Sequence, residues 1–522
     1  MAYSRIQYNG INIDFDRGLS AFSPFPVQVK NVVRSRAGVA QTLNFYRYWS
    51  FAIGRLFASA NLKNQVMAFW DYVRAGNPFS FWHDRDLMGY WNFEGKSYAD
   101  INERTATFTR DSIAFYVNPT TGLLAEVASN VARFPTGKFG RGLLSERAAT
   151  NLLTKSTEFS DASWNATNIT VTDNYDTNGA PAESPYLGGA DQVELTSTTG
   201  SFQKDVATNI GTQNLVFSVY LRTHEAGTKS GTLYIKREDT DDTLASQAIT
   251  ITPFWQRFSV NYVSAGDLTA DMRVRIEISG ASGNKFAIWG AMLEARSSIK
   301  SPSSFIYTTT TNASRNYEET RYTLSNFFDN EMIKGSLCFW YSSFAASPIG
   351  RTLIGAVLND GFLIVTETAD NLLEFSISTK TGGGITVSGT DPTSPTPGTF
   401  NHYAFTWDST IANGLKIYVN GILLATSSNS VFSISRVKAA TNYLYFGGDT
   451  ADVGADGTFD DIEIWRDVLT AEDLAARARG LYTMGYDRNY FPALMIDEAA
   501  LGFTHLPALP NWDLEIPVRE AL

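Results

Sequence analysis

Short runs in which apolar and polar residues alternate recur along most of the chain, separated by clusters of Gly, Ser and Thr. Examples are 215–221 (LVFSVYL), 272–278 (MRVRIEI) and 415–419 (LKIYV). A period of two places alternate side chains on a buried face and on a solvent face, so each run predicts a β-strand. Asn420-Gly421 after the third run tolerates the positive φ angles of a tight hairpin. Many short strands between turns favour β-sandwiches over parallel α/β sheets.

Helical periodicity is confined to two stretches. Residues 61–75 (NLKNQVMAFWDYVRA) place apolar side chains at helical spacing and end before Gly76. In the second stretch, 470–482, Thr470 is placed to cap the helix together with Asp473 three residues later. Both patterns predict amphipathic packing helices. The predicted fold class is therefore mainly β, with several sandwich or jelly-roll modules and a small α+β domain at the N-terminus.

Shifts in composition divide the chain into five segments. Residues 1–86 are rich in Phe, Tyr, Trp and Arg, 87–148 hold two short strand-like pieces, and 149–315 are rich in Thr and Ser. Residues 316–482 form a further strand-rich block, and 483–522 carry four prolines. Because proline removes a backbone donor, the last segment is expected to run as an extended tail along another surface.

Charge and cysteine content exclude several classes of protein. The chain of 522 residues has 42 Lys and Arg against 53 Asp and Glu, a formal net charge of −11. Binding to a phosphate backbone would therefore gain little free energy from counterion release, and nucleic acid is not an expected partner. Cys338 is the single cysteine and only four histidines are present, which excludes an internal disulfide and a Cys/His zinc cluster. No apolar run reaches the ~18 residues of a membrane span, and no secretory signal opens the sequence.

Residues 108–151 contain a series of short motifs. FTRDSIAFYV at 108–117 leads to NVARF at 130–134, GLLSE at 142–146 and ATNLL at 149–153. This series resembles a linker found in structural proteins of tailed bacteriophages, where it precedes a sandwich like a carbohydrate-binding module. The segment 149–315 is similar to such a module: EFSDASW opens it at 158–164, and IWGAMLE at 288–294 resembles its closing strand.

The block after residue 316 resembles a laminin-G-like, concanavalin-type jelly roll. The resemblance is carried by GSLCFWY at 335–341, HYAFTW at 402–407, KIYVNG at 416–421 and FDDIEIW at 459–465. That family begins with a strand like GYWNFEG, which here lies at 89–95, before the first sandwich. Two hypotheses stay open: 149–315 is inserted into a discontinuous jelly roll, or 87–148 merely links two complete domains.

The first 86 residues resemble docking domains of phage distal-tail or baseplate proteins, through QTLNFYR at 41–47 and NPFSFW at 77–82. Aromatic residues interleaved with arginines also suit a protein interface. The resemblance implies a virion location in the tail, synthesis in the host cytoplasm, contacts with other virion structural proteins, and a homo-oligomer such as a trimer or hexamer. Symmetric copies of weak sugar-binding faces would then adsorb to a host-surface polysaccharide through avidity.

Two sets of residues are candidates for ligand binding. Trp164 lies near a loop, where its ring could stack on a sugar, whereas Trp289, Trp407 and Trp465 lie within alternating strands and are predicted to be core residues.

The turn 449–457 supplies the carboxylates Asp449, Asp452 and Asp456, and oxygen ligands are what Ca²⁺ prefers. The spacing does not match an EF-hand, so the turn is interpreted either as a solvated acidic loop or as a calcium site. No other cofactor is expected.

No set of residues predicts catalysis. The run from His83 to Asp86 lacks a nucleophile at a suitable spacing, and His402 is interpreted as structural. The chain is therefore predicted to be a non-enzymatic, lectin-like component of a phage tail tip or baseplate. Two alternatives stay open: a decoration or spacer protein that binds nothing, and a depolymerase of capsular glycans, which needs two carboxyl groups at a defined separation.

Overall fold

The fold is taken from a computed structural model of the chain. It describes the following residues: 3–8, 11–15, 21–34, 40–58, 68–69, 79–84, 87–91, 93, 106–173, 189–207, 211–264, 266, 270–296, 301–324, 332–344, 350–358, 361–368, 370–379, 383–393, 396–434, 442–448, 454–479, 490–496, 502–505 and 512–520. The chain divides into two compact units, one of Met1–Met88 with Trp465–Leu522 and one of Gly89–Ile464.

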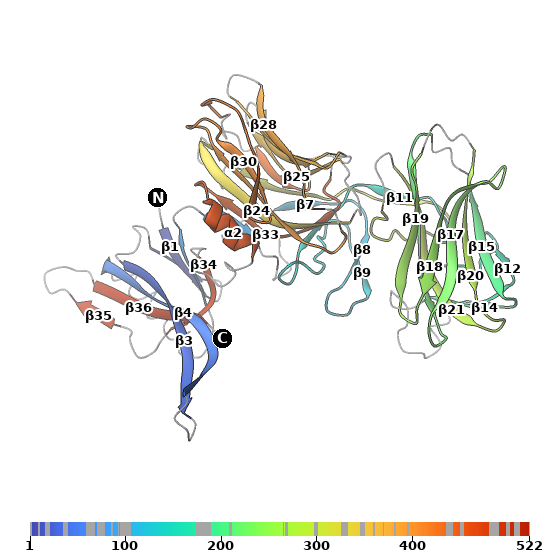
Figure 1. The fold of residues 1–522 in the computed structure, drawn as a ribbon, viewed down its shortest axis with the longest axis horizontal. Helices are drawn as coiled ribbons and strands as arrows, with labels where there is room; N and C mark the ends of the chain where they lie inside the picture. The colour runs from blue at the N-terminus through green and yellow to red at the C-terminus, as the bar shows by residue number, and fades with distance from the viewer. Residues whose placement is uncertain are drawn as a thin grey trace. The chain divides into compact units, whose positions relative to one another are not determined.

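The first unit contains one antiparallel sheet made from both ends of the chain. Its strands lie in the order β2-β1-β5-β34-β36-β4-β3, and β35 pairs with β36, so the red C-terminal strands lie between blue N-terminal ones (Figure 1). The segment expected as an extended tail therefore supplies three strands to this sheet. The strands are β1 (Tyr3–Tyr8), β2 (Ile11–Phe15), β3 (Ala21–Arg34), β4 (Ala40–Ala58), β5 (Phe79–Asp84), β34 (Tyr490–Ile496), β35 (Gly502–His505) and β36 (Trp512–Glu520).

The second predicted helix is present in this unit as α2 (Ala471–Ala478). Its N-terminus has the expected capping box: the Thr470 hydroxyl accepts a hydrogen bond from the Asp473 backbone N–H at 3.1 Å, and the Asp473 carboxylate accepts one from the Thr470 backbone N–H at 3.1 Å. The helix predicted over 61–75 lies outside the described residues except at positions 68 and 69, which are helical.

The second unit contains two sheets that form a jelly roll, in the orders β10-β33-β24-β29-β30-β31, with β6 also pairing β33, and β28-β27-β26-β25-β32-β23-β7. The early strands are β6 (Leu87–Trp91), β7 (Thr107–Thr109) and β10 (Leu143–Ser145). The later ones are β23 (Glu319–Thr323), β24 (Lys334–Ser343), β25 (Arg351–Leu358), β26 (Gly361–Glu367), β27 (Leu372–Ser378), β28 (Gly384–Thr390), β29 (Asn401–Asp408), β30 (Leu415–Val419), β31 (Ile422–Thr426), β32 (Tyr443–Phe446) and β33 (Gly457–Trp465).

Each jelly-roll sheet therefore takes strands from both sides of the 149–315 segment. Trp91 on β6 is 1% exposed and packs against Tyr322 and Phe446, with ring centroids 5.1 and 5.0 Å apart. The expected hairpin joins β30 and β31, with Asn420 and Gly421 at φ values of 50° and 80°.

The segment between these strands folds as a sandwich of two five-stranded antiparallel sheets, drawn in green in Figure 1. One sheet has the order β12-β15-β20-β17-β18 and the other β13-β14-β21-β16-β19. The strands are β12 (Asn165–Thr167), β13 (Ile169–Thr172), β14 (Asp191–Leu195), β15 (Thr199–Val206), β16 (Asn214–Thr223), β17 (Lys229–Arg237), β18 (Thr243–Ile251), β19 (Gln256–Tyr262), β20 (Met272–Ser279) and β21 (Lys285–Arg296).

Alternation along the strands fills the interior of this sandwich. Phe217, Val219 and Leu221 of β16 face the core, as do Val274 and Ile276 of β20, and all five side chains are fully buried. The residues between them therefore lie on the two outer faces of the sandwich. The fold class predicted from the sequence, mainly β with several sandwich modules, is confirmed.

Two small elements connect the sandwich to the jelly roll: the hairpin of β8 (Ala114–Val117) and β9 (Leu124–Val127), and the pair of β11 (Ala149–Asn151) with β22 (Ala313–Arg315). The amide of Asn151 holds the second pair against the sandwich. It donates to the carbonyls of Ala291 and Ile306 at 3.1 and 2.9 Å and accepts from two backbone N–H groups, those of Leu153 and Leu293. Across the described residues, no helix is long and apolar enough to cross a bilayer.

Candidate functional site

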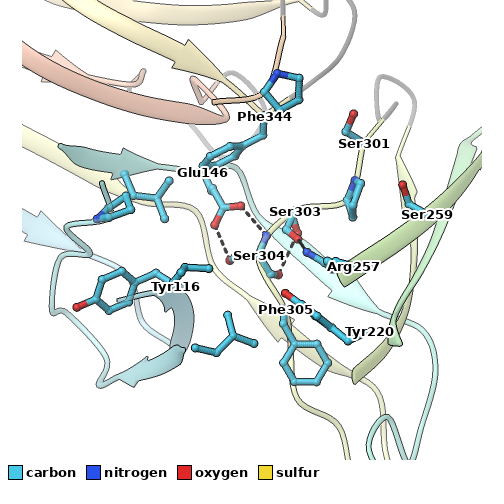
Figure 2. Close-up of a pocket in the computed structure, with 16 residues that line it drawn as sticks. Tyr116, Glu146, Tyr220, Arg257, Ser259, Ser301, Ser303, Ser304, Phe305 and Phe344 are labelled. Atoms are coloured by element: carbon cyan, nitrogen blue, oxygen red, sulfur yellow. Dashed lines mark hydrogen bonds between the residues drawn. The ribbon is translucent and has the colours of Figure 1, made fainter. Parts of the chain in front are cut away.

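A cavity of about 490 Å³ lies on the outer face of the β16–β19 side of the sandwich. Its walls combine aromatic rings with polar groups, and this volume falls within the ~300–1,000 Å³ typical of small-ligand sites. The aromatic lining residues are Tyr116, Tyr220, Phe305 and Phe344, and the polar ones are Glu146, Arg257, Ser259, Ser301, Ser303 and Ser304. Figure 2 shows these side chains around the cavity, with hydrogen bonds donated by Ser304 to Glu146 and by Arg257 to Ser303.

The sandwich contributes its wall through strand alternation. Because Val219 and Leu221 point into the core, Tyr220 points outward, and it lies opposite Arg257 in the register of β16 and β19. The Arg257 guanidinium lies over the Tyr220 ring, 5.5 Å from its centroid. This is a cation–π contact of ordinary geometry.

The β8–β9 hairpin supplies the opposite wall. Phe115 and Leu124 pack with Trp289 and Phe305 in one apolar cluster, which fixes the hairpin on the sheet. The ring centroids of Phe115 and Phe305 are 5.6 Å apart, and those of Trp289 and Phe305 are 4.4 Å apart. Tyr116, the next residue on the hairpin, is left at the cavity with part of its surface exposed.

A buried network of charged residues supports the segment Ser301–Phe305 from behind. Arg133 pairs with Glu146 at 2.5 Å and with Glu318 at 2.7 Å, Arg110 pairs with Glu318 at 2.6 Å, and Arg315 lies 3.3 Å from Glu146. All five side chains are at most 1% exposed. We refer to Arg110, Arg133, Glu146, Arg315 and Glu318 as the charge network. A buried charge must be paired and hydrogen-bonded, and here each one is.

The charge network positions the cavity's serines through Glu146. Its carboxylate accepts hydrogen bonds from the Ser304 backbone N–H at 2.8 Å and from the Ser304 hydroxyl at 2.6 Å. Burial raises the pKa of Glu146, but the charges of Arg315 and Arg133 and the Ser304 hydrogen bonds outweigh it and lower the pKa to about 2. Glu146 is therefore ionised at neutral pH, and both of its oxygens are engaged.

Ser303 is held by a second buried carboxylate, that of Glu294. Its oxygens accept hydrogen bonds from the Ser303 backbone N–H at 2.9 Å and from the Ser303 hydroxyl at 2.7 Å. Burial raises the pKa of Glu294, and the charges of Arg296 and Arg257 oppose that rise. The carbonyl of Ser303 remains for Arg257, whose Nη1 donates to it at 2.5 Å.

Trp164 is not a stacking surface in this structure, contrary to the expectation from its sequence position. It is 3% exposed, its ring packs on Phe159 at 4.7 Å, and Lys204 Nζ lies 5.1 Å from its ring centroid. Its indole N–H donates to the Lys155 carbonyl at 3.0 Å. The ring faces are therefore covered by protein. Trp289, Trp407 and Trp465 are 1–3% exposed, as predicted for core residues.

The candidate calcium turn lies only in part within the described residues. Asp449 and Asp452 lie outside the described residues, and Asp456 is 5% exposed and bound to Arg147, whose Nε donates to its carboxylate at 2.7 Å. No group of three potential metal ligands occurs among the described residues. The donor set therefore gives no support to a calcium site at Asp456, whose negative charge is matched by Arg147.

The neighbouring carboxylates Asp460 and Asp461 are also structural. Burial, together with the charge of Asp461, raises the pKa of Asp460 to about 8, and its carboxylate accepts a hydrogen bond from the Phe139 backbone N–H at 2.9 Å. Asp461 accepts a hydrogen bond from the Tyr90 hydroxyl. His402, interpreted as structural, is 1% exposed and packs edge-on against Trp340.

Sequence reasoning did not select Tyr220 or Arg257, although it identified the strands that carry them. The available signal was the alternation itself, which predicts that Tyr220 is an aromatic residue on the outer face of its strand. Three members of the charge network, Arg110, Arg133 and Glu146, lie in the motifs at 108–117, 130–134 and 142–146. Their partners Arg315 and Glu318 lie more than 160 residues later, so the role of these motifs in joining two modules is not visible from the local sequence.

Comparisons with known proteins agree with the fold of the jelly roll. Residues 309–475 match the Laminin_G_3 family model, described as the concanavalin A-like lectin/glucanases superfamily. The chain thus contains a concanavalin-like jelly-roll domain. A search of the curated proteins gave no match.

Several solved structures share low similarity with the chain. The match to a heptameric SAP-like pentraxin from Limulus polyphemus has 15% identity and a TM-score of 0.24, and it covers 31% of this chain and 75% of the pentraxin chain. The CBM40 of Ruminococcus gnavus IT-sialidase bound to α2,3 sialyllactose is 18% identical over 28% of this chain and 83% of its own, with a TM-score of 0.23. The receptor binding domain of botulinum neurotoxin C/D mosaic serotype is 15% identical over 31% and 40%, with a TM-score of 0.26.

Proposed function

We propose that the chain is a non-enzymatic glycan-binding protein and that a saccharide binds in the cavity beside Tyr220 and Arg257. The observation that carries this proposal is the composition of the cavity wall, where partly exposed tyrosine rings lie next to serine hydroxyls and a guanidinium. Aromatic rings bury the apolar faces of pyranose rings, and hydroxyl and guanidinium groups meet their hydroxyls. The family matched by 309–475, which includes Phe344 and Pro397 of the cavity wall, is described as lectins and glucanases, and this supports an interaction with glycans.

Binding is favoured over hydrolysis because of the carboxylates available at the cavity. A glycosidase uses two carboxyl groups about 5–9.5 Å apart, one of them able to donate a proton. Glu146 is the one carboxylate among the described lining residues, and its low pKa and engaged oxygens suit neither an acid nor a nucleophile.

We further propose that the chain acts in a tailed-phage particle, at the tail tip or baseplate, where copies of the cavity would bind a host-surface polysaccharide. The resemblance of 108–151 to a phage linker and of 1–86 to docking domains supports this location. Symmetric repetition would raise a weak single-site affinity by about 10²–10⁴ through avidity. Quantitative mass spectrometry of purified phage particles tests this location. Particles that do not contain the chain would contradict it.

The glycan-binding proposal is tested by Tyr220→Ala in the full-length chain on a glycan array. Loss of one aromatic contact should weaken binding about fivefold or more, since such a contact contributes about 1 kcal/mol beyond its burial. Tyr234→Ala is the matched control, because Tyr234 also lies under an arginine, Arg275 at 6.0 Å, but on the outer face of the other sheet.

Three results are informative. Selective weakening by Tyr220→Ala supports the proposal. Equal weakening by both substitutions contradicts the assignment of the site. Binding of the wild-type chain to no glycan contradicts the function itself and favours a decoration or spacer role.

A further inference from the structure

We infer that the saccharide bound in this cavity carries a carboxylate group, as a uronic acid does, and that Arg257 recognises it. This inference rests on the proposed function and specifies its ligand. It starts from the position of Arg257, a partly buried arginine that lines the cavity and makes no ion pair with any described residue.

The hydrogen bonds of Arg257 leave part of its guanidinium unused. Nη1 donates to the Ser303 carbonyl at 2.5 Å, and Nη2 donates to the Ser218 hydroxyl at 3.0 Å and lies 3.9 Å from the sulfur of Met292. Nε is buried and has no hydrogen-bond partner among the described residues. A guanidinium has five N–H donors. On Arg257 two of them have oxygen acceptors and one donates to the Met292 sulfur, which leaves two without an acceptor among the described residues, the buried Nε–H and one on Nη1.

Both of the arginine's oxygen partners are neutral, which leaves its positive charge without a counterion in contact. A partly desolvated charge of this kind favours an anionic partner, and a guanidinium fork matches a carboxylate through two parallel hydrogen bonds. The Tyr220 ring beneath it restricts the guanidinium plane, so that less rotamer freedom is lost when a ligand binds.

The charges behind the cavity favour the same choice. The charge network holds three arginines against two glutamates, an excess of one positive charge. Glu294 opposes this excess and interacts electrostatically with Arg257, but it does not line the cavity, makes no ion pair with Arg257, and has its pKa raised by burial, which disfavours its charged form. Arg257 and Glu146 are the charged residues of the described cavity wall, and Glu146 is fully paired. An acidic sugar would therefore meet the positive charge of Arg257.

The inference is tested by isothermal titration of the full-length chain with tetragalacturonate and with its methyl ester, which has the same shape without the charge. We expect the wild-type chain to prefer the acid by roughly 10- to 100-fold, the range of one charge-assisted hydrogen-bond pair. Arg257→Gln should abolish this preference, and Arg257→Lys, which keeps the charge but not the fork, should retain part of it.

Arg275→Gln is the matched control, because Arg275 lies over Tyr234 on the other sheet and pairs with Glu277 at 2.8 Å. It should leave the preference unchanged. Thermal unfolding of each variant verifies that the sandwich is folded, since Arg257→Gln also removes contacts to Ser303 and Ser218.

The outcomes separate this inference from the proposed function. A wild-type chain that binds acid and ester equally, with both lost in Tyr220→Ala, keeps the function and overturns the carboxylate. A preference for the acid that persists in Arg257→Gln overturns the role of Arg257. A wild-type chain that binds neither these probes nor any saccharide on the glycan array overturns the proposed function, and this inference with it.

Discussion

The two sheets of the sandwich carry the same cross-strand pair on their outer faces, a tyrosine with an arginine over its ring, in two different surroundings. On the β17–β20 face, Arg275 lies over Tyr234 and pairs with Glu277. On the β16–β19 face, Arg257 lies over Tyr220, contacts neutral oxygens, and is covered in part by the β8–β9 hairpin and the segment 301–305.

The remaining charges on the β17–β20 face are also paired with one another. Arg273 bonds Asp205 at 2.6 Å and Asp241 at 3.0 Å, and Lys236 bonds Asp241 at 2.5 Å. Asp205 and Asp241 are half exposed, so solvent screens these pairs and they contribute little free energy. The same pair of residue types therefore becomes a candidate site when neighbouring chain segments cover it and no carboxylate neutralises it.

The largest difference in stability is expected between two glutamate substitutions, one at Glu318 in the charge network behind the cavity and one at Glu277 on the β17–β20 face. Glu318→Gln leaves Arg110 and Arg133 without their shared buried counterion, which should lower the free energy of unfolding by about 3–5 kcal/mol. Glu277→Gln on the exposed face should cost about 0–1 kcal/mol. Denaturant unfolding of both variants measures the contrast, and similar losses in the two would show that the charge network is not a structural support.

A second difference concerns acid stability. The folded pKa of Glu146, about 2, is depressed below its ordinary value of 4.5, so its stabilising contribution is present above about pH 4.5 and is lost as the pH falls toward 2. The loss should reach roughly 3 kcal/mol by the end of that range. Denaturant unfolding between pH 6 and pH 2, buffered at constant ionic strength, measures this slope.

The control for that slope is Asp239, in the turn between β17 and β18. Its hydrogen bond from Arg237 lowers its pKa, but the carboxylate is solvent-exposed, so Asp239→Asn should leave the slope unchanged. Glu146→Gln should flatten it. An acid limb as steep in Glu146→Gln as in the wild type would contradict the role given to Glu146.

Local sequence signals predicted much of the fold. Alternation predicted the strands, Asn420-Gly421 predicted the β30–β31 hairpin, and Thr470 with Asp473 predicted the cap of α2, because each of these features is decided by residues close together in the chain. The same alternation also predicts that the Tyr220 side chain points outward. These signals do not depend on distant partners.

The candidate site depends on partners that are far apart in sequence. Glu318 meets Arg110 and Arg133, which precede it by 208 and 185 residues, and no local pattern predicts that distant contact. The burial of Trp164 depends in part on such a partner, because Lys204, forty residues later, lies over its ring together with the nearby Phe159. Likewise, the missing counterion of Arg257 is a property of three-dimensional packing.

Hydrogen–deuterium exchange of the full-length chain, with and without a saccharide identified on the glycan array, tests the central claim most directly, because it reports which face of the sandwich the ligand covers. We expect slower exchange in β16, β19 and 301–305, with no change in β17 or β20. Protection of β17 and β20 instead, or no protection anywhere in the sandwich at saturating saccharide, would contradict a binding site beside Tyr220 and Arg257.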